Sequence, residues 1–190
     1  DELHVGDMLS ENSLAQSMNM SRTPVREAFR RLNSEGLIVI IPGRGAFVKP
    51  ITLPEQHDIY ELRVVLECHA VRTAIHNIKA EELEQVKRIW QEMLGKVEKG
   101  EEIDWVYLVI QDHNLHSMIL DRCSNKQVGK VMQNVSMMNL RYMMYAAKAL
   151  NNPIATIKQH LEIIDLMKKK DADQLCGVLK EHIWNSERDI

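Results

Sequence analysis

Four residues in the second half of the sequence carry side chains that bind transition metals. Asp112 and His116 are four positions apart, a spacing that places two side chains together on one face of a helix. The rest of that face is apolar and consists of Leu108, Leu115 and Ile119. Burying an unpaired carboxylate or imidazole costs several kcal/mol, so polar residues on an apolar face need a partner. Asp112 and His116 are therefore candidate ligands of a buried ion.

Two later histidines also fall on apolar faces of expected helices. His160 follows Ile157 by three positions, and His182 follows Leu179 by three. Each histidine is eleven residues from Asp171, where one helix is expected to end and the next to begin. An antiparallel hairpin about this break brings both imidazoles to the same depth, because a helix rises about 1.5 Å per residue. We therefore expect the two histidines to converge on one ion.

One carboxylate and three imidazoles are a suitable donor set for a divalent transition metal. Zinc is favoured, nickel, manganese and iron are alternatives, and solvent or an effector would complete the coordination shell. A single histidine in such a place is more often a hydrogen-bonded core residue. Four polar residues at matched depth favour a metal. The predicted ligands are Asp112, His116, His160 and His182.

Arginines dominate a second segment, close to the N-terminus. The chain carries a net charge of −3, yet residues 21–49 contain six basic residues against two acidic ones. Arg22, Arg26 and Arg30 recur every four residues on one helical face, while Val25 and Phe29 belong to an apolar stripe. Guanidinium groups bind guanine edges and phosphates, so this face is typical of DNA binding. A solvated cationic helix is the alternative that the charge pattern alone leaves open.

The elements around these arginines predict a winged helix-turn-helix. A short helix is expected within 10–18 and a second one within 21–35. Two short apolar strands, 37–41 and 46–48, flank a tight turn of sequence Pro-Gly-Arg-Gly at 42–45. The hairpin formed by these strands is the expected wing.

The rest of the sequence predicts helices alone. Prolines at positions 50 and 54 interrupt the pattern, which places a winged helix-turn-helix domain at 1–50 and a helical domain at 51–190. The fold class is therefore mostly α, with a small β-hairpin wing followed by an antiparallel bundle of about six helices. The expected helices are 55–78, 80–98, 103–121, 125–149, 154–170 and 171–189.

Composition narrows the class of protein. With 45% hydrophobic and 27% charged residues, the chain resembles an ordinary globular protein, and it lacks an apolar run of the ~18 residues needed to span a membrane. The three cysteines are scattered, which suits reduced thiols. The start of the chain shows no pattern of an export signal. We therefore expect a cytoplasmic protein.

The N-terminal segment resembles the GntR family of bacterial regulators. The resemblance rests on Ser-Arg-Thr-Pro-Val-Arg-Glu-Ala at 21–28, on Glu-Gly-Leu at 35–37 and on the turn at 42–45. It implies that the two motif arginines contact bases, that the hydroxyl side chains hold phosphate, and that the wing glycine enters the minor groove beside a basic wing tip. The family's first helix would precede Asp1, so we expect an N-terminally truncated DNA-binding domain. The predicted DNA contacts are Ser21, Arg22, Thr23, Arg26, Gly43 and Arg44.

The C-terminal pattern resembles the FadR-like subfamily, whose FCD domains bind metal through an Asp-x3-His pair and two later histidines. The four candidate ligands match this pattern completely. Arg63 and Glu67 match a recurring Arg-x3-Glu pair, and the resemblance implies that the arginine faces a cavity and binds an effector carboxylate. A salt bridge on a solvated helix face is the alternative. Arg141 is a second candidate for effector binding.

Together these features predict a DNA-binding transcription regulator, with a repressor favoured over an activator. The resemblance implies a homodimer that reads a palindromic double-stranded operator and responds to a small carboxylate effector at the metal site. Sensing of the metal ion itself is one alternative. A metallohydrolase is another, but no acid or base is placed beside the expected site, so we expect no enzyme.

Overall fold

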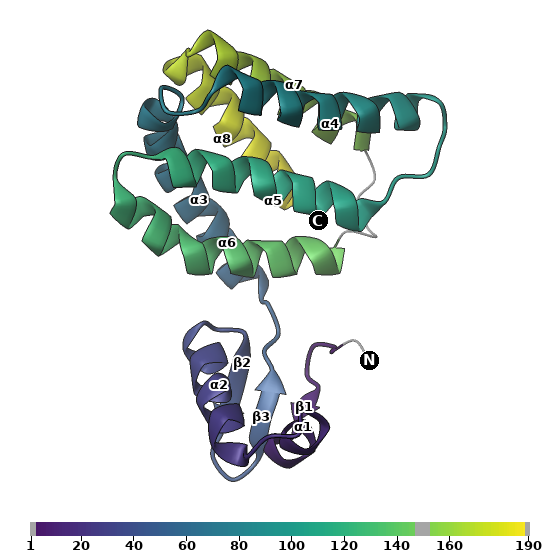
Figure 1. Cartoon of the computed structure of the whole chain (residues 1–190), viewed down its shortest axis with the longest axis vertical. Coiled ribbons are helices and arrows are strands. Elements are labelled where there is room, and N and C mark those ends of the chain that lie inside the picture. The colour runs from purple at the N-terminus through teal and green to yellow at the C-terminus, as the bar shows by residue number, and fades with distance from the viewer. Residues whose placement is uncertain (1–2, 147–152, 189–190) are drawn as a thin grey trace. The chain divides into compact units, whose positions relative to one another are not determined.

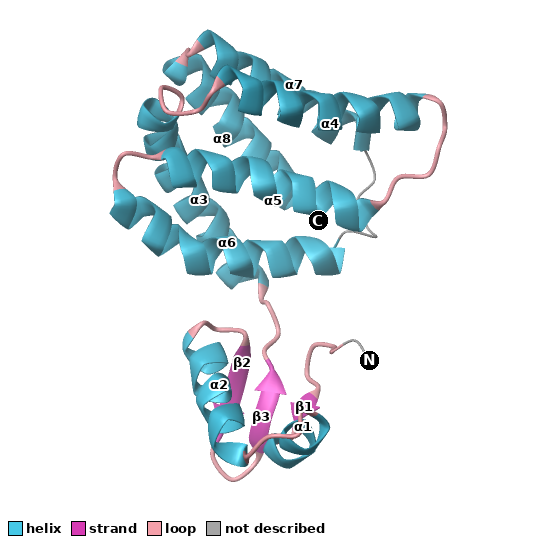
Figure 2. Ribbon diagram, viewed as in Figure 1, coloured by secondary structure: helices cyan, strands magenta, loops and turns pink. Residues whose placement is uncertain are grey.

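The computed structural model describes residues 3–146 and 153–188. The chain divides into two compact units, residues 1–52 and residues 53–190, and each is described by itself (Figure 1). The first unit combines two helices with a small sheet, and the second is entirely helical in its described residues (Figure 2). The expected fold class, a winged helix-turn-helix followed by a six-helix bundle, is confirmed.

The first unit contains a three-stranded antiparallel sheet in the order β1-β3-β2. Ile41 pairs with Gly45 beside the turn, and Met8 pairs with Phe47 on the other edge of β3. The sequence predicted only the hairpin β2-β3, because β1 has two residues and is too short to show an alternating pattern. The elements are β1 (Met8–Leu9), α1 (Glu11–Ser17), α2 (Arg22–Ser34), β2 (Ile38–Ile41) and β3 (Gly45–Val48).

Local signals set the ends of the two N-terminal helices. The Ser10 side chain accepts a hydrogen bond from the Ser13 amide and caps α1. Asn19 then adopts a left-handed φ of 51°, which turns the chain toward α2. Beyond the C-cap of α2, Gly36 has a φ of 75°, a conformation that costs glycine little. These signals were all visible in the sequence.

A small apolar core holds α2 against the sheet. Val25 and Phe29 are the buried residues of α2, and they cluster with Ile38 and Ala46 from the hairpin. Ala28, the apolar residue next to Phe29, is exposed. The opposite face of α2, which carries Arg22, Arg26 and Arg30, is exposed to solvent.

The second unit is a bundle of six helices. α3 packs against α5, α6 and α8, which makes it the central helix, and α4 packs against α7 (Figure 1). α3 ends four residues earlier than expected, because the amides of Asn77 and Ile78 both bond to the Ala74 carbonyl in a closing turn. The helices are α3 (Leu53–Ala74), α4 (Ala80–Glu98), α5 (Trp105–Arg122), α6 (Lys126–Ala146), α7 (Pro153–Lys169) and α8 (Ala172–Arg188).

The expected ends of two helices, at 147–149 and at 189, lie outside the described residues. Within the described part of the chain, no helix is both long enough and apolar enough to cross a membrane. The core of the bundle is aliphatic around two large aromatic side chains, Trp90 and Tyr60, both without solvent exposure. Buried polar residues accompany this core, and they form the site.

Candidate metal centre and DNA-binding face

Three helices bring the four expected metal ligands together. Asp112 and His116 lie one turn apart on α5, His160 lies on α7, and His182 lies on α8. All four side chains are at most 5% exposed. One ligand atom from each of them lies within 4.8 Å of every other. The convergence expected from the sequence is therefore present.

The donor atoms are spaced as ligands of one ion would be. Asp112 Oδ1 lies 2.8 Å from His160 Nε2, 3.5 Å from His182 Nε2 and 3.6 Å from His116 Nε2. The two Nε2 atoms of His116 and His182 are 3.3 Å apart. Ligands about 2.1 Å from a zinc-sized ion are separated by roughly 3.0 to 3.4 Å in tetrahedral or octahedral geometry. This buried set of three imidazoles and one carboxylate therefore fits a divalent transition metal.

The opposite nitrogen of each imidazole contacts an oxygen, which fixes the ring. An Nδ1–H that donates to oxygen leaves the Nε2 lone pair free for a metal, and such outer partners raise ligand basicity. The partners are Glu67 for His116, the Thr156 carbonyl at 2.7 Å for His160, and Gln159 Oε1 at 3.2 Å for His182. The arrangement therefore presents all three Nε2 atoms to the same point.

Arg63 and Glu67 form a buried ion pair beside this cluster. Arg63 Nε donates to Glu67 Oε1 over 2.8 Å, and the two residues are 3% and 1% exposed. The alternative of a salt bridge on a solvated face is therefore wrong. Since Glu67 also contacts His116, this carboxylate links Arg63 to a candidate metal ligand.

Charge is balanced within the buried site. Burial disfavours the charge of Glu67, but His116 and Arg63 outweigh burial and lower the pKa of Glu67 to about 2. Burial likewise opposes charge on His116, yet Glu67 and Asp112 raise its pKa to about 9. For His182, burial and the neighbouring His160 act together and lower the pKa to about 3. Without a metal, the favoured state is thus a charged His116 between two carboxylates and a neutral His182.

Trp90 on α4 covers one ligand from outside. Its ring stacks on the His160 ring with centroids 3.8 Å apart and an interplanar angle of 8°. Trp90 is fully buried, so it holds the imidazole plane in place. The sequence did not single out this residue, because contact between α4 and α7 depends on how the helices pack.

This stack predicts a spectroscopic signal. Adding Ni²⁺ to chelator-treated protein should quench roughly a third of the tryptophan emission, because Trp90 is one of three tryptophans and contacts a candidate ligand. A Trp90→Phe variant should still bind metal by elemental analysis but should lose most of this quenching. Equal quenching in both proteins would place the ion away from His160.

Three polar contacts of the cluster were not predicted. Thr156 and Gln159 precede His160 by four residues and one residue, and nothing in their type marks them as partners of a metal ligand. Glu67 stood in a recognised pair, but its contact with His116 joins residues 49 positions apart. The contacts of Glu67 and Gln159 join different helices and depend on how those helices pack, which no local pattern reports. The Thr156 contact is local, because its carbonyl lies one turn before His160 on the same helix.

Arg141 lies outside this cluster. It is half-buried on α6, where burial lowers its pKa and Glu55, in the first turn of α3, opposes that effect. The adjacent Tyr142 hydrogen-bonds Gln56 in the same region. The charged group that shifts the pKa of Arg141 therefore lies on α3 and is not one of the candidate metal ligands.

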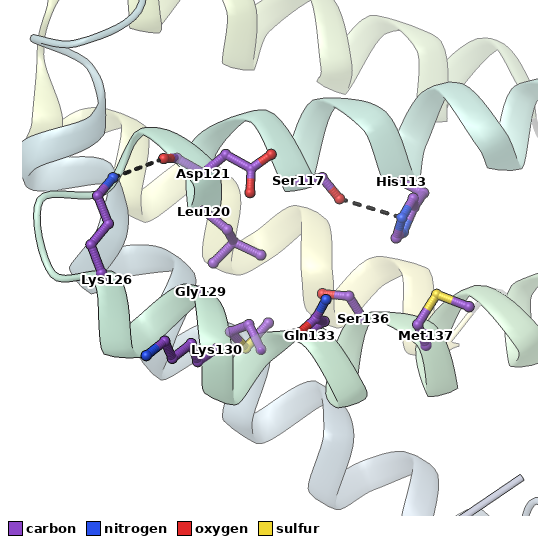
Figure 3. Close-up of a pocket in the computed structure, with 11 residues that line it drawn as sticks. His113, Ser117, Leu120, Asp121, Lys126, Gly129, Lys130, Gln133, Ser136 and Met137 are labelled. Atoms are coloured by element: carbon purple, nitrogen blue, oxygen red, sulfur yellow. Dashed lines mark hydrogen bonds between the residues drawn. The ribbon is translucent and has the colours of Figure 1, made fainter. Parts of the chain in front are cut away.

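A groove of about 530 Å³ runs between α5 and α6 (Figure 3). His113 and Ser117 line it from α5, with 3.4 Å between His113 Nε2 and Ser117 Oγ. Ser136 and Met137 line it from α6. None of the four candidate ligands contributes to the lining, although His113 adjoins Asp112 in the sequence. The groove is thus a separate feature from the candidate metal centre.

The predicted DNA-contacting residues lie at the start of α2 and at the wing tip. Ser21 is the N-cap of α2, but its side chain makes no capping hydrogen bond. Arg22 and Thr23 follow in the first turn, and both are exposed. At the wing, Gly43 has a φ of 74° and Arg44 is exposed. The start of a helix and a basic turn are suited to phosphate and groove contacts.

Among the contacts of the described residues, Arg26 is the one predicted DNA contact that is held by an acidic partner. Its guanidinium forms a two-pronged ion pair with Glu11 of α1, the shortest contact being 2.9 Å, and the side chains are 48% and 31% exposed. The hydrogen bond to Glu11 raises the pKa of Arg26. Exposed ion pairs of this kind contribute little stability, so DNA can displace Glu11 at low cost.

We expect a Glu11→Gln variant to bind duplex DNA about two- to fivefold more tightly at low salt, because it frees Arg26 and removes a charge that repels phosphate. Fluorescence anisotropy with a labelled duplex measures the change. Glu35→Gln is the matched control, since Glu35 pairs with Arg31 at the other end of α2 and its loss changes the net charge equally. The same gain in both variants would show that net charge, and not Arg26, is responsible.

These two units define a class of protein: a transcription regulator with a winged helix for reading DNA and a helical domain with a buried polar site. Residues 1–48 match the family of bacterial regulatory proteins called gntR, and residues 58–185 match the FCD domain. The chain therefore belongs to the GntR family of DNA-binding transcription regulators, with an FCD C-terminal domain. The family consists of regulators and not of enzymes, which leaves the metallohydrolase alternative without support.

Characterised relatives cover most of the chain. The HTH-type transcriptional repressor RspR of Escherichia coli (strain K12) is 27% identical over 180 residues, which are 94% of this chain and 77% of RspR. The Nta operon transcriptional regulator of Aminobacter aminovorans is 26% identical over 182 residues, covering 94% of this chain and 81% of that protein. The solved structure of E. coli McbR/YncC has a TM-score of 0.79 at 23% identity, over 97% of this chain and 86% of that one. It shows the same fold.

Proposed function

We propose that this protein is a cytoplasmic transcription repressor whose operator binding is modulated by a small carboxylate effector at a metal site. The observation that carries the proposal is the buried cluster of Asp112 and three histidines beside the buried guanidinium of Arg63. A repressor is favoured because RspR, which aligns with 94% of the chain, bears that description.

The donor set supports zinc as the resident metal. Three imidazole nitrogens and one carboxylate oxygen are ligands that zinc accepts, and nickel, manganese and iron accept them too. A metal at this point supplies fixed positive charge and coordination positions that an effector carboxylate can fill. The outer contacts of Glu67 and Gln159 support the metal by orienting the imidazoles.

Arg63 is the proposed partner of the effector carboxylate. Glu67 engages its Nε, and a guanidinium carries further N–H donors in a planar fork that suits a carboxylate. The guanidinium also lies over the Tyr60 ring in a cation–π contact, with Arg63 Cζ 5.5 Å from the ring centroid. Arg141, near the C-terminal end of α6, remains a second proposed effector residue.

DNA recognition is proposed to use the exposed basic surface formed by the N-terminal half of α2 and the wing tip. In a homodimer, two copies of α2 would read the halves of a palindromic operator. The proposed base contacts come from two arginines and the others from phosphate-binding and wing residues, namely Ser21, Arg22, Thr23, Arg26, Gly43 and Arg44. An effector that prefers one arrangement of the bundle would shift the affinity for the operator by the same coupling free energy.

The test combines operator selection with effector addition. Duplexes that bind the metal-loaded protein are selected from a random library, and their affinity is then measured by anisotropy with and without a panel of small carboxylic acids. At least one acid should change the operator affinity of the metal-loaded protein and leave that of the chelator-treated protein unchanged. If free zinc alone changes operator affinity across its physiological range and no acid does, the metal-sensing alternative replaces the effector.

A further inference from the structure

Asn139 on α6 has a buried side-chain amide whose carbonyl oxygen is an unsatisfied hydrogen-bond acceptor. The residue is 5% exposed, and its Oδ1 atom, shielded from solvent, has no hydrogen-bond partner among the described residues. It shares the inward stripe of α6 with Met132 and Met143, which are also buried. Gln56, a second buried amide on the neighbouring helix α3, bonds the Tyr142 side chain instead. A buried carbonyl without a partner is costly, so it indicates a group that binds there.

Contacts between the helices fix the depth of Asn139. The Tyr60 hydroxyl on α3 donates to Met143 Sδ on α6 over 3.4 Å, and Val109 on α5 clusters with Met143. These three side chains form one layer of the bundle, which joins the three helices. Asn139 precedes Met143 by four residues and therefore lies about one turn away from it along α6.

The next layer contains the proposed effector-binding groups. Arg63 follows Tyr60 by three residues on α3, and Asp112 follows Val109 by three on α5. α6 runs antiparallel to α5, as shown by Gly129 lying beside the Leu120 carbonyl while Met143 lies beside Val109. One turn away from the first layer therefore lie Arg63 on α3, Asp112 on α5 and Asn139 on α6, which together form the next layer.

We infer that the effector is a small hydroxycarboxylic acid and that Asn139 is the residue that recognises its hydroxyl group. The inference rests on the proposed function, in which Arg63 and the metal centre bind the carboxylate. A hydroxyl both donates and accepts, so it satisfies the Asn139 amide in either orientation of the amide group. A site with a buried polar group rejects the analogue that lacks the matching hydroxyl, because the polar group then stays unpaired.

Isothermal titration of the metal-loaded full chain tests this with matched acids: malate against succinate, lactate against propionate, and gluconate against hexanoate. In the unmodified protein, the hydroxy acid of at least one pair should bind about 10- to 100-fold more tightly than its deoxy partner. In Asn139→Leu, of similar volume, the ratio should fall to about one. Asn134→Leu, an exposed position on the same helix, should keep the full ratio.

The melting temperature of the ligand-free protein separates a binding role from a structural one. Asn139→Leu should raise it by a few degrees, because the substitution removes an unsatisfied buried carbonyl. A variant that melts lower and still prefers the hydroxy acid would show that Asn139 supports the core, and would overturn the inference. Binding of both acids of every pair without preference would overturn it too, while leaving the carboxylate effector intact. If no acid binds the unmodified protein, the carboxylate-effector function fails, and the inference fails with it.

Discussion

Replacing His160 and His182 together by alanine should abolish metal binding. The two imidazoles supply half of the buried donor set, and their Nε2 atoms lie 2.8 and 3.5 Å from Asp112 Oδ1. Elemental mass spectrometry should find about one metal per chain in the unmodified protein and less than a tenth of that in the variant. A single carboxylate and one imidazole cannot hold the ion against solvent, so reloading should not restore it.

The same variant should lose the stabilisation that the metal provides. At free metal near 1,000 times the dissociation constant, binding stabilises the folded state by about 4 kcal/mol. For a chain of this size, that corresponds to roughly 8 to 16 °C in melting temperature. The unmodified protein should therefore lose this amount on chelation, and the variant should not respond to chelator at all.

A matched control uses two histidines that are exposed on the bundle surface. His69→Ala with His76→Ala removes the same number of imidazoles and should keep both the metal and the response to chelator. Far-UV circular dichroism confirms that each variant is folded before its metal is measured. Absence of metal from the unmodified protein even after loading would return the cluster to a hydrogen-bonded core and refute the prediction.

Replacing Arg22 by alanine should cost about 10- to 100-fold in affinity for the selected operator, because a bidentate contact from arginine to guanine discriminates strongly between bases. The loss should be much smaller on a random duplex, which offers only phosphate contacts. Anisotropy at a fixed salt concentration measures both affinities. Arg44→Ala should instead weaken binding to all duplexes alike and reduce the salt dependence by about one counterion.

Arg72 provides the control for this experiment. It is an exposed arginine in the helical unit, paired with Asp173, and its replacement by alanine removes the same charge far along the chain from the basic surface. We expect operator affinity to stay within about twofold of the unmodified protein. An equal loss from Arg22→Ala on operator and random duplexes would assign Arg22 to phosphate binding and contradict a base-reading role.

Much of the architecture follows from patterns that are local in the sequence. The helix ends at Ser10, Asn19 and Gly36 depend on side chains within a few positions, so sequence alone places them. The six helices of the second half were also predictable, because apolar periodicity involves residues only three or four positions apart. Strand β1 was missed, because its two residues carry no pattern of their own and the strand is stabilised by pairing with β3, where Met8 lies opposite Phe47.

The candidate metal ligands were also predictable, since their depth along each helix follows from counting residues. His160 and His182 are each eleven residues from Asp171, so an antiparallel hairpin that turns there places them at the same depth along their two helices. The outer partners Glu67 and Gln159 were not predictable, because a helix can be rotated about its axis without changing any spacing. Whether Arg63 faces solvent or the core depends on that rotation, and only the structure shows that it is buried.

By itself, the sequence determined the fold class and located the expected DNA-contacting motif and the donor set of the candidate metal centre, since each depends on residue types at short or countable spacings. The tertiary structure alone decided that Glu67 joins Arg63 to His116, that Trp90 stacks on His160, and that the buried Asn139 Oδ1 has no hydrogen-bond partner among the described residues. These features join residues from different helices. They depend on the rotation and packing of whole helices, which are set by the summed burial of many side chains and not by any one segment.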